Sequence, residues 1–215
     1  MPRKNIRIGI IDYAASNLRS VQKAFTHIGA EVIVSSNAQE LNKADALIFP
    51  GQGSNDSAMQ ALSRASLIKP IIEFVNNDRP FLGICMGLQL LMESSEEGHE
   101  PCLGIYEGKV KRFSGEIKIP HMGWNQLEMT RNHQVFNDLP ENPYFYFVHS
   151  YYADPLDLNI VAATTNYGIE FCSAVAWGNA AAVQFHPEKS GAVGLVIYSN
   201  FVNIVKKCHG RKLWT

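Results

Sequence analysis

Cysteine is scarce in this chain, and its few copies are poorly spaced for metal or disulfide chemistry. The 215 residues contain four cysteines, Cys85, Cys102, Cys172 and Cys208, and no two of them form a C-x-x-C pair. Structural zinc sites and disulfide frameworks both depend on closely patterned cysteines. The spacing argues against a metal site and a disulfide scaffold, and it favours a reducing compartment such as the cytoplasm.

An excess of charge of either sign is also missing. Lysine and arginine together number 19, aspartate and glutamate number 20, and the pI is near 6.6. Nucleic-acid surfaces and polybasic membrane anchors need clustered basic residues. No long apolar run follows residues 1–5, so we expect neither a signal peptide nor a transmembrane segment. We therefore predict no nucleic-acid partner and no membrane partner.

Repeats, low-complexity tracts, linkers and a G-x-x-x-x-G-K-[ST] phosphate loop are absent as well. What is present predicts one α/β domain over residues 1–215. It would be a three-layer domain with a mostly parallel central sheet flanked by helices, plus a strand-rich second half. In the first half the apolar pattern predicts a helix at 17–28 and strands at 6–11, 32–34, 46–49 and 81–84. In the second half it predicts strands at 108–113, 126–129, 144–152, 160–164, 172–177 and 180–185, and a closing helix around 193–204.

Cys85 stands between two glycines, Gly83 and Gly87, where an apolar strand gives way to an apolar-periodic stretch. This G-x-C-x-G pattern is typical of a strained strand-to-helix turn that presents a nucleophile. Free N–H groups at the start of a following helix would favour the reactive thiolate. The alternative for a lone cysteine is an inert, buried apolar residue.

A second motif supplies the base that such a thiol needs. Residues 184–188 read Gln-Phe-His-Pro-Glu at the end of a buried strand, and in an extended chain His186 and Glu188 would point to the same side. A carboxylate beside an imidazole fixes its tautomer and stabilises its cation. His121 and His149 have no acid within two or three residues, so we expect them to be structural or to lie near the substrate.

These residues resemble the triad (class I) glutamine amidotransferases. The shared motifs are residues 49–53, 83–89 and 184–188, and the similarity runs essentially end to end. Two narrower motifs, residues 118–125 and 148–152, are similar to those of the glutaminase subunits of imidazole glycerol phosphate synthase.

The resemblance implies Cys85 as nucleophile, His186 as general acid and base, and Glu188 as the orienting carboxylate. It implies oxyanion donors at Met86 and in the Gly51–Gln52 loop, although relatives commonly carry a branched apolar residue where this chain has Gln52. A backbone donor survives any residue except proline. The glutamine-binding residues implied are Gly53, Gln89, Ser150 and Tyr151, and no metal or organic cofactor is implied.

Because the chain has no second site for an ammonia acceptor, we expect a partner chain. The resemblance implies a cyclase subunit that forms a heterodimer with this chain and receives ammonia, with Met122, Trp124 and Asn125 near the interface. Without the resemblance, Trp124 would be interpreted as a core residue. Three alternatives remain open: a paralogous glutaminase that serves another synthase, for example in surface-sugar biosynthesis, a stand-alone hydrolase of small amides or γ-glutamyl peptides, and a non-catalytic scaffold.

Overall fold

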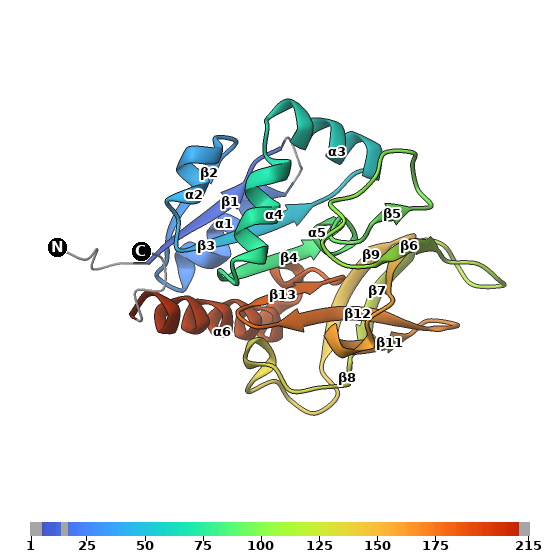
Figure 1. The fold of residues 1–215 in the computed structure, drawn as a ribbon. Helices are drawn as coiled ribbons and strands as arrows, with labels where there is room; N and C mark the ends of the chain where they lie inside the picture. The colour runs from blue at the N-terminus through green and yellow to red at the C-terminus, as the bar shows by residue number, and fades with distance from the viewer. Residues whose placement is uncertain (1–5, 14–16, 211–215) are drawn as a thin grey trace.

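The computed structural model describes residues 6–13 and 17–210, and an eight-stranded sheet crosses it (Figure 1). The strand order is β2-β1-β3-β4-β13-β12-β11-β8. The first five strands in this order are parallel to one another. They are β1 (Arg7–Ile11), β2 (Glu31–Ser35), β3 (Ala46–Gly51), β4 (Phe81–Cys85) and β13 (Ala180–Val183). The antiparallel strands are β12 (Glu170–Trp177), β11 (Val161–Asn166) and β8 (Glu128–Met129). The predicted α/β class with a mostly parallel sheet is confirmed.

Residues 1–5, on which the signal-peptide prediction rests, lie outside the described residues.

Helices cover both faces of the sheet, as the three-layer prediction requires. One face is covered by α1 (Leu18–His27) and α6 (Gly191–Gly210), and the other by α2 (Ala38–Asn42), α3 (Asn55–Arg64) and α4 (Ile68–Asn76). Successive side chains of a strand point to opposite faces. Ile48 therefore packs in the α1–α6 layer and the neighbouring Phe49 in the α2–α4 layer. Both faces of the central strands are buried, which explains their continuous apolar runs.

The second half adds two smaller sheets. One has the order β10-β6-β5 and consists of β10 (Tyr151–Pro155), β6 (Gly108–Arg112) and β5 (Ser94–Ser95). The other is an antiparallel ribbon of β7 (His121–Gln126) and β9 (Tyr144–His149). The prediction of one strand over 144–152 was wrong, because the chain changes sheets at Ser150, and β7 was not predicted. Short 3-10 turns complete the fold: η1 (Gln134–Phe136), η2 (Leu158–Ile160) and η3 (Pro187–Lys189).

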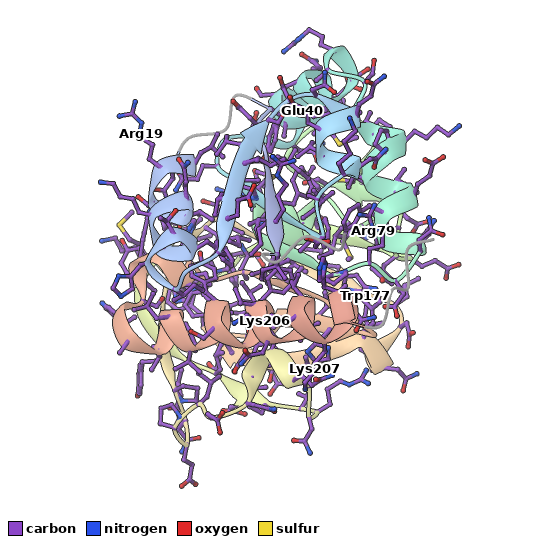
Figure 2. The ribbon with its side chains drawn as sticks, turned by 90° about the vertical axis from the view of Figure 1, so that its left-hand side faces the viewer. Arg19, Glu40, Arg79, Trp177, Lys206 and Lys207 are labelled. Carbon is purple, nitrogen blue, oxygen red and sulfur yellow. The ribbon has the colours of Figure 1, made fainter. Side chains whose placement is uncertain are left out.

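Several side chains pack together at the amino-terminal edge of the parallel strands. Figure 2 views the molecule from this side, with α6 running across it and Arg79 and Trp177 labelled. Arg79 lies just before β4, stacks 3.8 Å from the Phe74 ring centre and donates to the carbonyl of Ala44. Trp177 packs edge-on against Tyr106 with ring centres 4.6 Å apart. Open α/β sheets bind ligands at the opposite, carboxyl edge of the strands, so we expect a reactive site there.

None of the helices in the described part of the chain combines the length and the apolar composition needed to cross a bilayer.

Candidate active site

Cys85 occupies a strained backbone position where β4 ends. Its φ is 56° and its ψ is −107°, an unfavourable region for a residue with a side chain. The two flanking glycines are required by close packing. A Cβ on Gly87 would overlap the carbonyl oxygen of Phe49, and one on Gly83 would lie 2.7 Å from the carbonyl oxygen of Gly87. The G-x-C-x-G pattern thus forms the tight elbow that the sequence predicts.

The helix after the elbow is shorter than the apolar pattern suggests. It is α5 (Met86–Gln89), a single turn of four residues with Cys85 at its N-cap. So short a helix has a small macrodipole, and the unpaired N–H groups of its first turn are its main electrostatic contribution. Cys85 is 8% exposed, so its surroundings, and not open solvent, determine how its sulfur behaves.

The predicted base and carboxylate meet directly. His186 follows β13, and its Nδ1 donates to Glu188 Oε1 over 2.7 Å with both side chains 2% exposed. The sequence predicted that His186 and Glu188 pair, but the expected geometry, two residues on the same side of an extended chain, was wrong. His186 itself is extended, whereas residues 187–189 form the η3 turn, so Glu188 reaches the ring through a turn and not along a strand.

Two further side chains hold the Glu188 carboxylate, and sequence reasoning missed both. Asn17 Nδ2 donates to Oε1 over 2.7 Å, and the Tyr198 hydroxyl donates to Oε2 over 3.2 Å. Asn17 precedes α1 and is 171 positions from Glu188, while Tyr198 lies on α6. With His186, these donors satisfy both carboxylate oxygens and hold the side chain in place.

The electrostatics of His186 are dominated by its charged neighbours. Burial alone would lower its pKa, but the interactions with Cys85 and with the Glu188 carboxylate raise the pKa to about 9. His186 Nε2 is buried and makes no hydrogen bond to the described residues. The raised pKa favours the protonated ring, in which one nitrogen is held by the carboxylate and the other is available for proton transfer.

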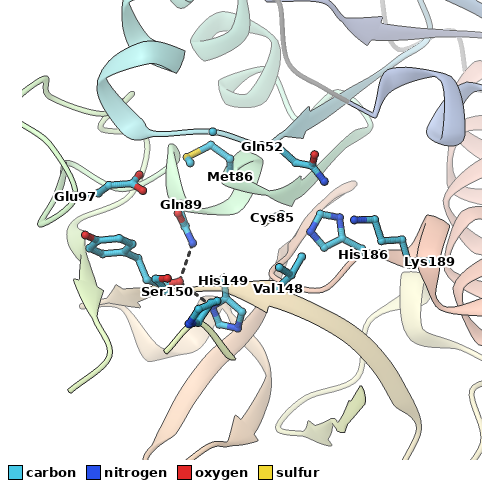
Figure 3. Close-up of a pocket in the computed structure, with 13 residues that line it drawn as sticks. Gln52, Cys85, Met86, Gln89, Glu97, Val148, His149, Ser150, His186 and Lys189 are labelled. Atoms are coloured by element: carbon cyan, nitrogen blue, oxygen red, sulfur yellow. Dashed lines mark hydrogen bonds between the residues drawn. The ribbon is translucent and has the colours of Figure 1, made fainter. Parts of the chain in front are cut away.

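A cavity of about 440 Å³ opens beside the elbow (Figure 3). The predicted residues that line it are Cys85, His186, Gln52, Gly53, Met86, Gln89, Ser150 and Tyr151. Gly51 is not in this lining, but it is the register partner of Cys85 in the β3–β4 pair. Residues from distant parts of the chain thus converge on one cavity. No group of three or more potential metal ligands was found among the described residues.

Two charged residues of the cavity were not predicted, Glu97 and Lys189. Figure 3 shows them at opposite ends, with Lys189 beside His186 and Glu97 far from it. Glu97 accepts a hydrogen bond from the backbone N–H of Asn55 over 2.8 Å, and burial raises its pKa. Glu97 belongs to a polar run, residues 93–101, whose composition suggests only a surface loop.

A buried amide also contacts the nucleophile. Gln184 is fully buried, and its Nε2 donates to Cys85 Sγ over 3.6 Å. Its Oε1 accepts from Gln89 Nε2 over 3.0 Å, and the same Gln89 nitrogen donates to the carbonyl of Tyr151 over 2.8 Å. The Gln89 amide is therefore engaged within the protein while it lines the cavity. The sequence offered a weak signal for Gln184, since it opens the His186 motif.

The residues predicted for the partner interface lie on β7. Met122 and Trp124 are 60% and 56% exposed, so the interpretation of Trp124 as a core residue was wrong. The Trp124 ring lies edge-on to Tyr146 across the ribbon, with ring centres 6.3 Å apart. Asn125 is half-buried, and its amide bonds to His121 and to the carbonyl of Asn166. Two large apolar side chains thus face outward from one strand.

The sequence is similar to known proteins over nearly its whole length. The model of the family "Glutamine amidotransferase class-I" matches residues 9–204. The chain is 50% identical over 204 residues to "Imidazole glycerol phosphate synthase subunit HisH" of Trichormus variabilis, covering 93% of this chain and 97% of that protein. The subunit of the same name from Dehalococcoides mccartyi is 47% identical over 195 residues, 90% of this chain and 95% of that protein.

Solved structures agree on the fold. The structure of PurLQS from Thermotoga maritima matches with a TM-score of 0.73 at 18% identity, covering 93% of this chain and 98% of that chain. A crystal structure described as a glutamine amidotransferase matches with a TM-score of 0.71 at 20% identity, covering 93% of this chain and 98% of that chain. By its family match and its identity to the HisH subunits, this chain belongs to the class-I glutamine amidotransferases, in the branch of the HisH subunits of imidazole glycerol phosphate synthase.

Proposed function

We propose that this chain is a glutaminase subunit that hydrolyses L-glutamine to glutamate and ammonia and delivers the ammonia to a cyclase in histidine biosynthesis. One observation carries the proposal. A cysteine on a strained elbow faces a cavity together with a histidine whose other ring nitrogen is bonded to a buried carboxylate. Nucleophile, base and orienting acid in that arrangement perform acyl transfer.

In the first half of the reaction, the Cys85 thiolate attacks the carboxamide carbon of glutamine. The carbon–nitrogen bond then breaks, and the leaving nitrogen takes a proton from His186 and departs as ammonia. In the second half, His186 removes a proton from water, which attacks the thioester and releases glutamate and the thiolate. Glu188 holds the ring in the required tautomer through Nδ1.

Negative charge develops on the carboxamide oxygen in both halves. We assign its stabilisation to the backbone N–H of Met86, the first residue after the nucleophile, and to an N–H of the Gly51–Gln52 loop. Met86 and Gln52 both line the cavity, and Gly51 is paired with Cys85. Preorganised backbone donors at such a position contribute on the order of 3–4 kcal/mol to lowering the barrier.

The amino-acid end of glutamine is proposed to lie toward Gly53, Gln89, Ser150 and Tyr151. Glu97 adds a carboxylate at the end of the cavity away from His186. A carboxylate there suits the α-ammonium group of the substrate, because an ion pair in a partly buried site orients a ligand more firmly than a neutral contact does.

The ammonia acceptor is proposed to be a cyclase subunit, with which this chain forms a heterodimer. The relatives are by name subunits of a synthase, and the outward Met122 and Trp124 give β7 the apolar character of an interface centre. Asn125 would lie at its rim. We place the protein in the cytoplasm, a proposal supported by four cysteines that form no disulfide.

The decisive experiment replaces Cys85 with alanine in the complex with the cyclase. We expect synthesis from glutamine to fall by at least a factor of about 1,000, since the acyl intermediate cannot form. Synthesis from added ammonium should persist at the wild-type rate, which shows that the complex is intact. Retained use of glutamine by the Cys85→Ala complex would refute the proposed function.

A matched pair of variants tests the interface. Trp124→Ala should weaken binding of the cyclase at least tenfold, because a large exposed aromatic side chain at an interface centre contributes about 2 kcal/mol or more. Ile169→Ala serves as the control, since Ile169 is also exposed but lies in the turn between β11 and β12. Equal affinities for both variants would exclude β7 as the interface.

A further inference from the structure

A continuous chain of hydrogen bonds runs from the β7–β9 ribbon to the Cys85 sulfur. Its outer half starts at Asn125, whose Nδ2 lies 3.2 Å from His121 Nε2. His121 Nδ1 lies 3.0 Å from His149 Nε2, and His149 Nδ1 lies 2.8 Å from the carbonyl oxygen of Tyr151. His121 and His149 are register partners on the two strands of the ribbon. Both residues are almost fully buried, with 3% and 6% of their surface exposed.

The inner half starts at the same Tyr151 oxygen. Gln89 Nε2 donates to it and also to Gln184 Oε1, and Gln184 Nε2 donates to Cys85 Sγ. Figure 3 shows the two dashed bonds, one from Gln89 and one from His149, that converge on this point. A single carbonyl therefore joins two polar systems, one from the ribbon and one from the nucleophile.

The chemistry of the groups fixes the direction of every bond. A carbonyl only accepts, so His149 carries its proton on Nδ1, and its Nε2 accepts from the Nδ1–H of His121. His121 Nε2 must then accept from the Asn125 amide. In the inner half of the chain, Gln89 Nε2 donates one hydrogen to the Tyr151 carbonyl and the other to Gln184 Oε1. The Gln184 oxygen is thereby occupied as an acceptor, and its NH₂ group has to point at the sulfur.

Both imidazoles must be neutral for this arrangement to exist. A proton added to His149 would place two N–H groups face to face between His149 and His121, and a proton added to His121 would do the same between His121 and the Asn125 amide. Burial lowers the pKa of His121 to about 4. Burial, with the nearby positive charges that His121 and His186 can carry, lowers the pKa of His149 to about 3. His121 is also stacked between aromatic rings, with Phe147 at 4.9 Å and Tyr167 at 4.0 Å between ring centres. The rings are thus held in place and kept uncharged.

We propose that His121 and His149 are positioning residues which, through the Tyr151 carbonyl and Gln89, direct the Gln184 amide to the sulfur of Cys85. The inference rests on the proposed glutaminase function. An N–H donor aimed at the sulfur stabilises the thiolate relative to the thiol, and it holds the sulfur on the cavity side of the elbow. The two histidines therefore act on the nucleophile through intervening groups, and of the two only His149 also lines the cavity.

The test compares His121→Phe, His149→Phe and His121→Asn in the full-length protein. Phenylalanine keeps the ring and removes the donor, whereas asparagine places an N–H near the position of Nδ1. The first readout is the pH midpoint for alkylation of Cys85 by iodoacetamide, which mass spectrometry detects. The second is kcat and KM for glutamine, measured in the cyclase complex. The titratable groups that face the sulfur are His186 and Tyr13, and Glu97 and Lys189 line the same cavity. All four are unchanged in these variants.

We expect both phenylalanine variants to raise the alkylation midpoint and to lower kcat about tenfold, with KM changed less than twofold. His121→Asn should recover most of the loss. Unchanged midpoints in folded phenylalanine variants, or an asparagine variant as impaired as His121→Phe, would overturn the inference. Failure of the proposed function would be recognised separately, by glutamine use that persists in the Cys85→Ala complex. In that case the alkylation midpoints would still show whether the two histidines act on the Cys85 sulfur.

A second measurement needs no substitution and covers the case in which a variant does not fold. Nitrogen chemical shifts of ¹⁵N-labelled histidine in the wild-type protein report the tautomer of each ring. We expect His121 and His149 both to carry their proton on Nδ1 between pH 6 and pH 8. An Nε2-protonated form of either ring breaks the chain of donors and would overturn the inference.

Discussion

Two regions of this protein bury imidazole rings to nearly the same extent and give them opposite properties. His186 at the carboxyl edge of the parallel strands is 2% exposed, and its pKa is raised to about 9. His121 and His149 in the β7–β9 ribbon are 3% and 6% exposed, and their pKa values are lowered to about 4 and about 3. Burial by itself disfavours the charged ring in both places. The charged neighbours, and not the depth of burial, decide the outcome.

The partners of each ring explain the contrast. His186 lies between the Glu188 carboxylate and the Cys85 sulfur, and the interactions with both raise its pKa. The ribbon pair bonds only to neutral groups, namely an amide, a carbonyl and another imidazole. The ring that transfers a proton, His186, lies beside groups that can carry negative charge. The pair that must keep a fixed hydrogen-bond direction, His121 and His149, bonds to no such group.

The largest effect is expected when the anion beside His186 is neutralised. Glu188→Gln keeps the shape of the side chain but removes its charge, so the pKa of His186 should fall and the ring lose its preferred tautomer. We expect kcat for glutamine to fall by a factor of about 100 to 10,000, the range seen when a triad carboxylate is replaced by its amide. The measurement is ammonia production in the cyclase complex.

Glu170→Gln provides the matched control, because Glu170 is an exposed carboxylate at the start of β12. It should leave kcat within a factor of two. Wild-type turnover by the Glu188→Gln protein would show that the charge of Glu188 does not cause the difference in properties between His186 and the ribbon histidines.

The pH dependence of stability should show the same contrast with smaller effects. The folded pKa of His186 lies above its ordinary value of 6.5, so its contribution is complete below pH 6.5 and is lost as pH rises toward 9. The folded pKa values of His121 and His149 lie below 6.5, so their contribution is complete above pH 6.5 and is lost as pH falls toward 4 and 3. Each group accounts for a few kcal/mol at most.

Urea unfolding from pH 4 to pH 9 measures this. The free energy of unfolding should decline on both sides of neutrality, and His149→Phe should flatten only the acid side. A variant whose acid limb keeps the wild-type slope would mean that His149 is already protonated in the folded protein near pH 6.

How much of this was predictable differs between the two regions. The elbow at Cys85 and the His186–Glu188 pair are recognisable because each is a short local motif at the end of an apolar strand. The ribbon is not, because β7 buries a histidine and exposes Met122 and Trp124, which reverses the usual alternation of apolar and polar side chains. Long-range partners leave no local pattern either. Asn17 reaches Glu188 across 171 positions, and only the folded structure brings them together.

The smallest effects are expected from the two side chains that hold Glu188. Asn17→Ala and Tyr198→Phe each remove one hydrogen bond to a carboxylate that keeps its other partners, so kcat should fall about 3- to 10-fold. Tyr198→Phe retains the packing against Phe25, whose ring centre lies 4.5 Å away. Its thermal unfolding midpoint should therefore stay near that of the wild type. A loss as large as that of Glu188→Gln would contradict the idea that these donors act only by holding the carboxylate.

The most direct test of the account is an NMR titration of the histidine rings from pH 4 to pH 10 in the wild-type and Cys85→Ala proteins. We predict that His186 titrates near pH 9 in the wild type and at a lower pH once the sulfur is removed, while His149 stays neutral across the range in both proteins. A wild-type His186 that titrates at or below pH 6.5, or one that Cys85→Ala leaves unmoved, would contradict the claim that sulfur, ring and carboxylate act as one charged unit.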